Sequence, residues 1–330
     1  MRRQRRRFLQ LAAGAAALPM LPGISSAQGA YPNKPITIVV PYAPGGPTDT
    51  IARVLAERMR TSLGQIVIVE NTTGAGGTTA VTRLFRSAPD GYTIMIGQWS
   101  SHVGAAAMYT LPFDYLSDFE PISLLSSGAI WVMGRKDFPA KDAKELVAWL
   151  KANPGKASAG TVGPGSGAHM CMVYLANSIG SSVQYVPYRG GAPAMQDLAS
   201  GTIDLACLEA GQTLPLISAG QFKPYAVLTA KRWFKAPDIP TFDEAGVPGL
   251  FFPFWHALWA PKGVPKDAIA KLNAAAVDAM ADAQVRQRLN DVGHELPSRE
   301  QLTPQALAAH HKAEIEKWTP IVKAANIKLQ

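Results

Sequence analysis

The chain has 330 residues, 47% of them hydrophobic, and a formal net charge of +8. Five arginines within residues 1–7 supply most of this charge, which leaves +3 for the rest of the chain. The remaining Lys and Arg residues are scattered among acids and form no basic stripe with interleaved aromatics, which argues against a nucleic-acid partner. A chain of this length exceeds the size at which one hydrophobic core usually keeps growing, so we expect two lobes.

Residues 1–27 have the pattern of a cleavable export signal. The basic start is followed by an apolar run, Leu11–Leu21, that is too short to span a bilayer, and by small residues up to Ala27. The stretch Arg5–Gln10 resembles the twin-arginine export pattern, from which only Gln10 departs; an ordinary secretory leader is the alternative. Either route places the mature protein in the periplasm.

The mature chain opens with a strand, a loop and a helix. Residues 36–40 read as a buried strand, 41–47 as a loop rich in Pro and Gly, and the helix that follows ends at Gly64. The first N–H groups of such a helix are unpaired and lie at the positive end of its dipole, so the unit predicts a site for an anion or a carboxylate. The same unit also begins ordinary α/β proteins, in which it holds only water.

Strands and helices continue to alternate along the chain, which predicts parallel sheets with helical crossovers. Further strands are expected at 66–69, 92–96, 122–125, 130–134, 157–161, 183–187, 203–208 and 225–228, with helices between most of them. An aromatic segment, 251–259, is interpreted as core and lobe packing, and three helices near 266–280, 282–290 and 304–325 end the chain.

The two α/β sets and the helical tail predict one discontinuous lobe and one inserted lobe. Residues 28–126 and 229–330 would form lobe 1 and residues 127–228 lobe 2, with crossings near Ser126 and Thr229 that act as a hinge around a cleft. Ligands in such sheets bind beyond the carboxyl ends of the strands. This rule places Tyr42–Asp49 and Gln98–His102 on one rim.

A glycine-rich loop, Gly163–Ala168, follows a predicted strand and opens a helix. It nominally fits a dinucleotide fingerprint, but Pro164 stiffens the turn and no acid closes the next strand, so we predict no nicotinamide site. Pro164 also replaces the first glycine of a nucleophile elbow. The loop is therefore interpreted as a second helix N-terminus, with the Ser166 hydroxyl, opposite the first. His169 either faces the cleft or is a local packing group.

Several other residues admit two interpretations. Arg189, after Tyr188, either holds a ligand carboxylate bidentately or is simply exposed. Asp49 would repel a ligand carboxylate, so it either stabilises the helix start or accepts a hydrogen bond from a ligand hydroxyl, an amine or a water. Cys171 and Cys207 are predicted to be buried free thiols, because one falls in a helix and the other in a strand; a disulfide is the alternative. The histidines, His310 and His311 included, form no metal-binding pattern, and no cofactor is predicted.

With these residues identified, the chain resembles the Bug receptors, the periplasmic solute-binding proteins of tripartite tricarboxylate transporters. The resemblance covers essentially the whole mature chain. It is carried by short motifs in the family's order: Tyr31-Pro-x-Lys-Pro-Ile, the Val-Pro-Tyr-Ala-Pro-Gly-Gly-Pro-Thr-Asp stretch that ends at Asp49, and segments 69–71, 74–77, 89–93, 118–121, 186–193 and 240–246.

The resemblance implies a type II periplasmic-binding fold of the α/β class, with two lobes of parallel-rich sheets flanked by helices and a ligand cleft between them. In that family the first loop holds a carboxylate, partly through ordered water, and the second-lobe loop faces it. Gln98-Trp99 departs from the small residues expected there, and we take Trp99 as a hint of an aromatic or longer ligand. The predicted ligand-binding residues are Tyr42, Ala43, Gly46, Thr48, Asp49, Trp99, Ser101, Gly165, Ser166, His169, Tyr188 and Arg189.

The expected function is that of a monomeric, non-enzymatic receptor that delivers a small carboxylic acid to membrane permease subunits. A ligand sensor that signals through a membrane partner is the first alternative. A periplasmic enzyme acting on a carboxylic acid is the second, and it lacks an identifiable base and nucleophile in the sequence.

Overall fold

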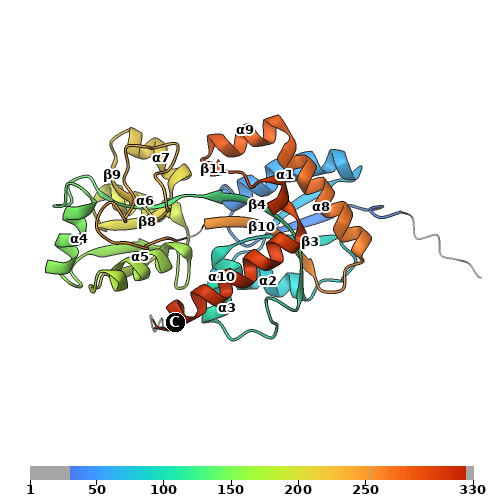
Figure 1. Cartoon of the computed structure of the whole chain (residues 1–330), viewed down its shortest axis with the longest axis horizontal. Coiled ribbons are helices and arrows are strands. Elements are labelled where there is room, and N and C mark those ends of the chain that lie inside the picture. Colours follow the sequence, from blue (N-terminus) through green and yellow to red (C-terminus); the bar gives the residue numbers. More distant parts are fainter. Residues whose placement is uncertain (1–29, 253, 325–330) are drawn as a thin grey trace, which may run out of the picture.

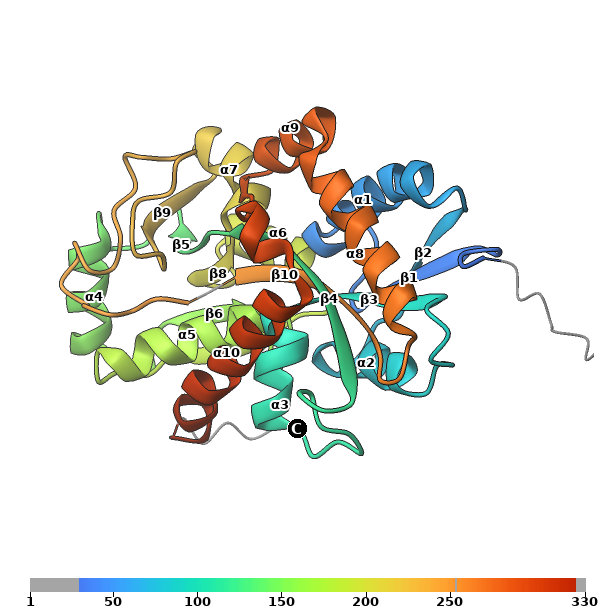
Figure 2. The ribbon, with the colours of Figure 1, turned by 45° about the vertical axis from the view of Figure 1, so that its right-hand side comes forward.

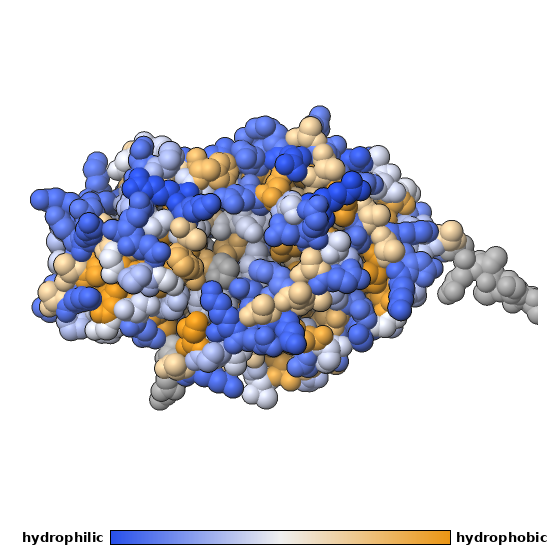
Figure 3. All heavy atoms as spheres, viewed as in Figure 1, coloured by the Kyte–Doolittle hydropathy of each residue, from blue (hydrophilic) through white to orange (hydrophobic). Residues whose placement is uncertain are grey.

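Two lobes, each built on its own sheet, lie side by side in the computed structural model, which describes residues 30–252 and 254–324 (Figure 1). The predicted export signal, residues 1–27, lies outside the described residues. Among the described residues no helix is both long and apolar enough to cross a membrane. The face shown in Figure 3 is mostly hydrophilic, and its apolar residues form separate patches.

Lobe 1 contains a six-stranded sheet in the order β11-β4-β10-β3-β1-β2. Its strands are β1 (Ile36–Val40), β2 (Val67–Asn71), β3 (Thr93–Gln98), β4 (Phe119–Gly128), β10 (Phe254–Pro261) and β11 (His294–Glu295). β1 is parallel to β2 and β3, and successive residues of β1 are buried on opposite faces, as expected for a strand covered on both sides.

Helices cover both faces of the lobe 1 sheet (Figure 2). The side chains Ile36 and Ile38 pack toward α1 (Pro47–Leu63), α8 (Lys266–Ala281) and α9 (Ala283–Asp291). Val39 packs on the other face, with α2 (Thr78–Phe85), α3 (Ala105–Met108) and α10 (Pro304–Ala324). Short helical turns, η1 (Ala75–Gly77), η2 (Ser100–Gly104) and η3 (Arg299–Leu302), complete the lobe.

Lobe 2 contains a five-stranded sheet in the order β7-β6-β8-β5-β9. Its strands are β5 (Ile130–Arg135), β6 (Ser158–Thr161), β7 (Gln184–Pro187), β8 (Leu205–Glu209) and β9 (Phe222–Val227). One face carries α4 (Ala143–Ala152) and α5 (Gly167–Ser178), and the other carries α6 (Gly191–Ser200) and α7 (Ala210–Ser218).

Both sheets are mixed, where the sequence predicted mainly parallel ones. β10 is antiparallel to β3 and β4, and β5 is antiparallel to β8 and β9. β11 is also antiparallel to β4. β5 and β10 are the first strands after the two crossings between the lobes. The aromatic segment interpreted as packing is β10 itself, which is buried along its whole length.

The chain crosses between the lobes later than predicted. The first crossing is at Ala129, between β4 and β5. Residues 229–250, predicted for lobe 1, instead pack on lobe 2, where Trp233 contacts Trp131 and the Val227 N–H donates to the Pro240 carbonyl. The return crossing therefore lies after residue 250, shortly before β10, and not near Thr229.

The cysteines are paired, so the prediction of free thiols is wrong. Cys171 on α5 and Cys207 on β8 form a disulfide with a Cα–Cα distance of 6.3 Å, and both are fully buried. The prediction assumed that a residue on a helix and a residue on a strand lie too far apart to pair. In the structure, α5 packs directly on β8, which brings the two cysteines together. The disulfide therefore joins a helix of lobe 2 to the strand beneath it.

We predict that the double variant Cys171→Ala/Cys207→Ala loses roughly 2–4 kcal/mol of unfolding free energy, because the bridge closes a loop with a sequence separation of 36 residues. Denaturant unfolding followed by circular dichroism measures the loss. Dithiothreitol should lower the stability of the parent protein and leave the double variant unchanged. Titration of two thiols in denatured, unreduced protein would contradict the pairing.

Candidate functional site

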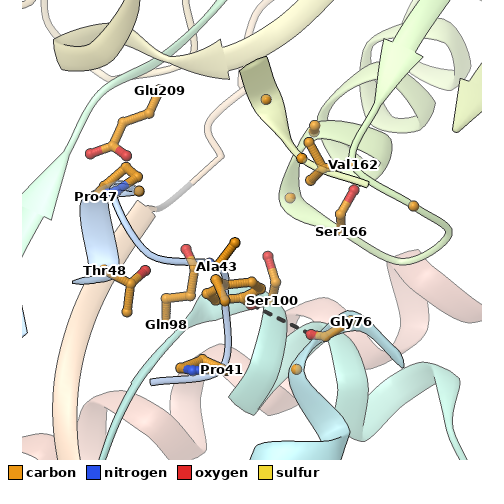
Figure 4. Close-up of a pocket in the computed structure, with 18 of the residues that line it drawn as sticks. Pro41, Ala43, Pro47, Thr48, Gly76, Gln98, Ser100, Val162, Ser166 and Glu209 are labelled. Carbon is orange, nitrogen blue, oxygen red and sulfur yellow. Dashed lines mark hydrogen bonds between the residues drawn. The ribbon is translucent and has the colours of Figure 1, made fainter. Parts of the chain in front are cut away.

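A cavity of about 930 Å³ lies between the lobes. Loops that follow the carboxyl ends of strands in both sheets line it, as the strand-end rule predicts. They are residues 41–48 after β1, 98–100 after β3, 162–168 after β6, 189–193 after β7 and 207–212 at the end of β8, together with 73–77 before α2. In Figure 4, Thr48, Gln98 and Ser100 lie on one side of the cavity and Val162 and Ser166 on the other.

The loop after β1 brings the N-terminus of α1 to the cavity. Gly46 is the N-cap residue, Pro47 occupies the first turn, and Gly45 adopts φ +82°, a conformation that favours glycine. Tyr42, Ala43, Gly46 and Thr48 line the cavity, as predicted for this loop. The Tyr42 hydroxyl points to the Gly76 carbonyl at 3.4 Å, and burial raises its pKa to about 12, so it stays a neutral donor.

The Asp49 side chain forms hydrogen bonds within lobe 1, and the residue is not among those that line the cavity. Its carboxylate accepts hydrogen bonds from the Gly45 N–H, from Arg53 Nε and from Asn71 Nδ2, each at 2.9 Å. Burial alone would raise the pKa of this carboxyl, but the hydrogen bonds from Arg53, Gly45 and Asn71 outweigh burial and hold it below its usual value. Of the two interpretations of Asp49, the geometry supports the structural one, because its carboxylate fixes the loop.

Thr48 contacts a buried histidine of β10. Its hydroxyl lies 3.1 Å from His256 Nε2, and both side chains are almost fully buried. Burial, reinforced by the nearby His294, lowers the pKa of His256 well below its usual value. The imidazole is therefore neutral, and its tautomer decides whether Thr48 donates to it or accepts from it.

The loop after β6 forms the opposing helix N-terminus. Ser166 caps α5, where its hydroxyl oxygen accepts from the His169 N–H at 3.2 Å, and its own O–H stays free to donate into the cavity. The His169 side chain accepts from the Gly165 N–H at 3.0 Å, and burial lowers its pKa to about 4. His169 and Gly165 thus shape the loop, and neither is among the lining residues.

Trp99, Ser101 and Tyr188, all predicted to bind ligand, point elsewhere. Trp99 is fully buried and packs against Phe252 and Trp318, with ring centroids 4.5 and 5.0 Å away, because the π-helical turn η2 directs it into the core. It offers no surface to an aromatic ligand in this arrangement of the lobes. The Ser101 hydroxyl bonds to the Gln98 backbone and to His102, and the Tyr188 hydroxyl donates to Asp197.

Arg189 lines the cavity, as predicted. It is exposed and makes no hydrogen bond or ion pair with any other described residue. Sequence reasoning missed the polar lining residues Tyr109, Glu209 and Gln212, and it placed Gln98 and Ser100 on the rim without naming them as binding residues. The described residues hold no group of three His, Cys, Asp or Glu side chains arranged to bind a metal.

We predict that Asp49→Asn costs roughly 1–3 kcal/mol of unfolding free energy at neutral pH, because it weakens three hydrogen bonds to a buried charge. The pKa of Asp49 is lower in the folded state, so its contribution is complete above the unfolded value of about 4 and is lost as the pH falls through the folded value. The difference between parent and variant in denaturant titrations should therefore shrink below about pH 4. Asp238→Asn, an exposed acid, is the control. A difference that stays constant down to pH 2 would contradict this assignment.

Comparison with known proteins agrees with this geometry. The model of the tripartite tricarboxylate transporter family receptor matches residues 51–327. A protein of Agrobacterium vitis, described as a UPF0065 protein in the TAR-I ttuE-ttuC' intergenic region, is 38% identical over 93% of this chain and 88% of its own length.

Two solved structures are also similar. The periplasmic binding protein BugD is 38% identical, with a TM-score of 0.84 over 91% of this chain and all of its own. MatC of Rhodopseudomonas palustris, solved with bound malate, is 36% identical, with a TM-score of 0.83 over 88% of this chain and all of its own. The chain thus belongs to the Bug-type tripartite tricarboxylate transporter receptors, a family of periplasmic solute-binding proteins.

Proposed function

We propose that this receptor captures a small carboxylic acid between its lobes and presents the closed, liganded form to the membrane permease of a tripartite tricarboxylate transporter. The observation that carries the proposal is the convergence of helix N-termini on one cavity. Residues in the first turns of α1 from lobe 1 and of α5 and α6 from lobe 2 all line it. Unpaired N–H groups and dipole ends at these positions favour an anion.

The side chains around these helix ends fit the same ligand class. Thr48 and Ser166 present hydroxyls from opposite lobes, and Arg189 is the only basic residue among the described lining residues. A ligand carboxylate held between the lobes would draw them together, because it interacts with both at once. The malate bound to MatC supports a small carboxylic acid, and the family description supports a permease partner.

Binding without turnover is the proposed mode of action. Ser101 with His102 resembles a catalytic pair, but neither residue lines the cavity. Thr48, which does line it, pairs with His256, but His256 Nδ1 has no hydrogen-bond partner among the described residues. A histidine that activates a hydroxyl is normally oriented by a third group at that nitrogen. We further propose that the leader, residues 1–27, directs export to the periplasm, with the twin-arginine route favoured by Arg5–Gln10, and that the mature receptor is a monomer.

Calorimetric titration with di- and tricarboxylic acids, combined with small-angle X-ray scattering, tests the proposal. At least one acid should bind with 1:1 stoichiometry, be recovered unchanged, and reduce the radius of gyration as the lobes close. Chemical conversion of the bound acid would instead indicate an enzyme. Absence of binding across the acids would refute the carboxylate receptor.

Arg189→Gln should weaken binding of the acid roughly ten- to hundredfold, because it removes a charged donor from the cavity. The melting temperature of the unliganded protein should stay unchanged, since Arg189 makes no hydrogen bond or ion pair with any other described residue. Arg60→Gln, an exposed arginine near the end of α1, is the matched control and should bind like the parent. Equal affinities of the Arg189 and Arg60 variants for the acid would show that Arg189 does not bind the ligand.

A further inference from the structure

Glu209 is the only acidic residue among the described residues that line the cavity. It ends β8 and occupies the N-cap position of α7, but its carboxylate accepts no hydrogen bond from the first turn of that helix. In Figure 4 the side chain lies at the Pro47 end of the cavity, away from Ser166. The Glu209 carboxylate therefore does not cap the N-terminus of α7.

The carboxylate is buried and accepts no hydrogen bond from any described residue, although one of its oxygens lies close to a histidine. Its Oε1 lies 2.8 Å from Nε2 of His294, a residue of β11 in the other lobe, and the two side chains are 6% and 1% exposed. Its Oε2 is buried and accepts no hydrogen bond from any described residue. Gly128, at the lobe crossing, leaves the space for this contact, because a Cβ there would approach Oε1 to 3.2 Å.

A buried carboxylate oxygen without a hydrogen-bond donor lowers the stability of the closed arrangement, because the oxygen loses its hydrogen bonds to water and forms none with the protein. In the arrangement of the lobes seen here, Oε2 is shielded by protein, so water reaches it only when the lobes part. A ligand enters the cavity at that same moment. If the ligand brings a donor to the accessible side of the Glu209 carboxylate, the lobes close over a carboxylate that has a hydrogen bond. If it does not, they close over a carboxylate that has none.

We propose that Glu209 is a specificity-determining residue that selects carboxylic acids bearing a hydroxyl or ammonium group over plain acids of the same length. The inference rests on the proposed function, because the helix N-termini and Arg189 would take the ligand carboxylate and Glu209 would take its donor. The described lining residues then include one basic and one acidic side chain, which complement the two kinds of group on a hydroxy or amino acid. A second ligand carboxylate placed next to Glu209 would be repelled.

Titration calorimetry with matched acids tests the inference. The probes are three sets that differ only at one carbon: succinate, malate and aspartate; glutarate, 2-hydroxyglutarate and glutamate; and 3-phenylpropionate, phenyllactate and phenylalanine. In the set that binds best, the parent protein should prefer the hydroxy or amino acid roughly ten- to hundredfold over the plain acid, as expected for a hydrogen bond to a charged acceptor. Which of the two binds better identifies the donor.

Glu209→Met, which keeps the length of the side chain and removes the acceptor, should reduce that preference to near one. Glu209→Gln should abolish a preference for ammonium and preserve part of a preference for hydroxyl, because its amide oxygen still accepts. Glu295→Met makes the same change at an exposed acid next to His294, outside the cavity, and should keep the parent's preference.

The outcomes separate the two proposals. Binding of plain acids as tightly as their substituted partners by the parent protein would overturn the role of Glu209, even where the Met variant fails to fold. A preference that survives in Glu209→Met would overturn it as well. Binding of none of the acids by the parent would refute the carboxylate receptor itself.

Discussion

The two lobes are joined by strands that are hydrogen-bonded to each other where they cross. β4 ends at Gly128, which pairs with Phe254 at the start of β10. In lobe 2 the Phe252 N–H of the returning segment donates to the Leu228 carbonyl, and the Leu228 N–H donates to the Ile130 carbonyl at the start of β5. Such a ribbon resists shear between its strands and permits bending, so the relative motion it allows is a hinge. Because the cavity lies between the sheets that this ribbon connects, the same few residues set both the position of the cavity and the way it opens.

Charge is distributed around the cavity so that few charged side chains face it. Asp49 sits at the start of α1, where a free carboxylate would repel an anion, yet it is turned inward and neutralised by Arg53 and two other donors. The attraction for an anion therefore comes mainly from backbone N–H groups, which are fixed by the fold and need no reorganisation when the ligand arrives. Arg189 adds an exposed positive charge to the lining, and Glu209 adds a buried negative one.

Much of this arrangement follows from patterns that the sequence makes visible. Strand ends, Gly-Pro loops and helix starts recur with the spacing of α/β units. They predict that the loops at Tyr42–Thr48 and Gly163–Ser166 lie opposite each other, and residues of both loops line the cavity. The strand β10 escaped prediction because a buried central strand has no alternating pattern, and Phe254–Pro261 reads equally well as core packing. The return crossing was predicted too early because the sequence around Trp233 does not indicate which lobe this residue packs against.

The sequence did not predict the directions of side chains, and these directions determine which residues line the cavity. Trp99, Ser101 and His169 lie within a few residues of the cavity, yet a π-helical turn and a serine cap direct them into the protein. Glu209 shows the converse: it stands at a position where an acid usually caps its own helix, so its sequence context suggests a local role. Its carboxylate lies beside His294 of β11 in the other lobe, and Gly128 leaves the space for this contact. Contacts between the lobes depend on the tertiary fold. Local sequence patterns therefore could not predict that Glu209, the acidic residue proposed to select the ligand, lies in the cavity.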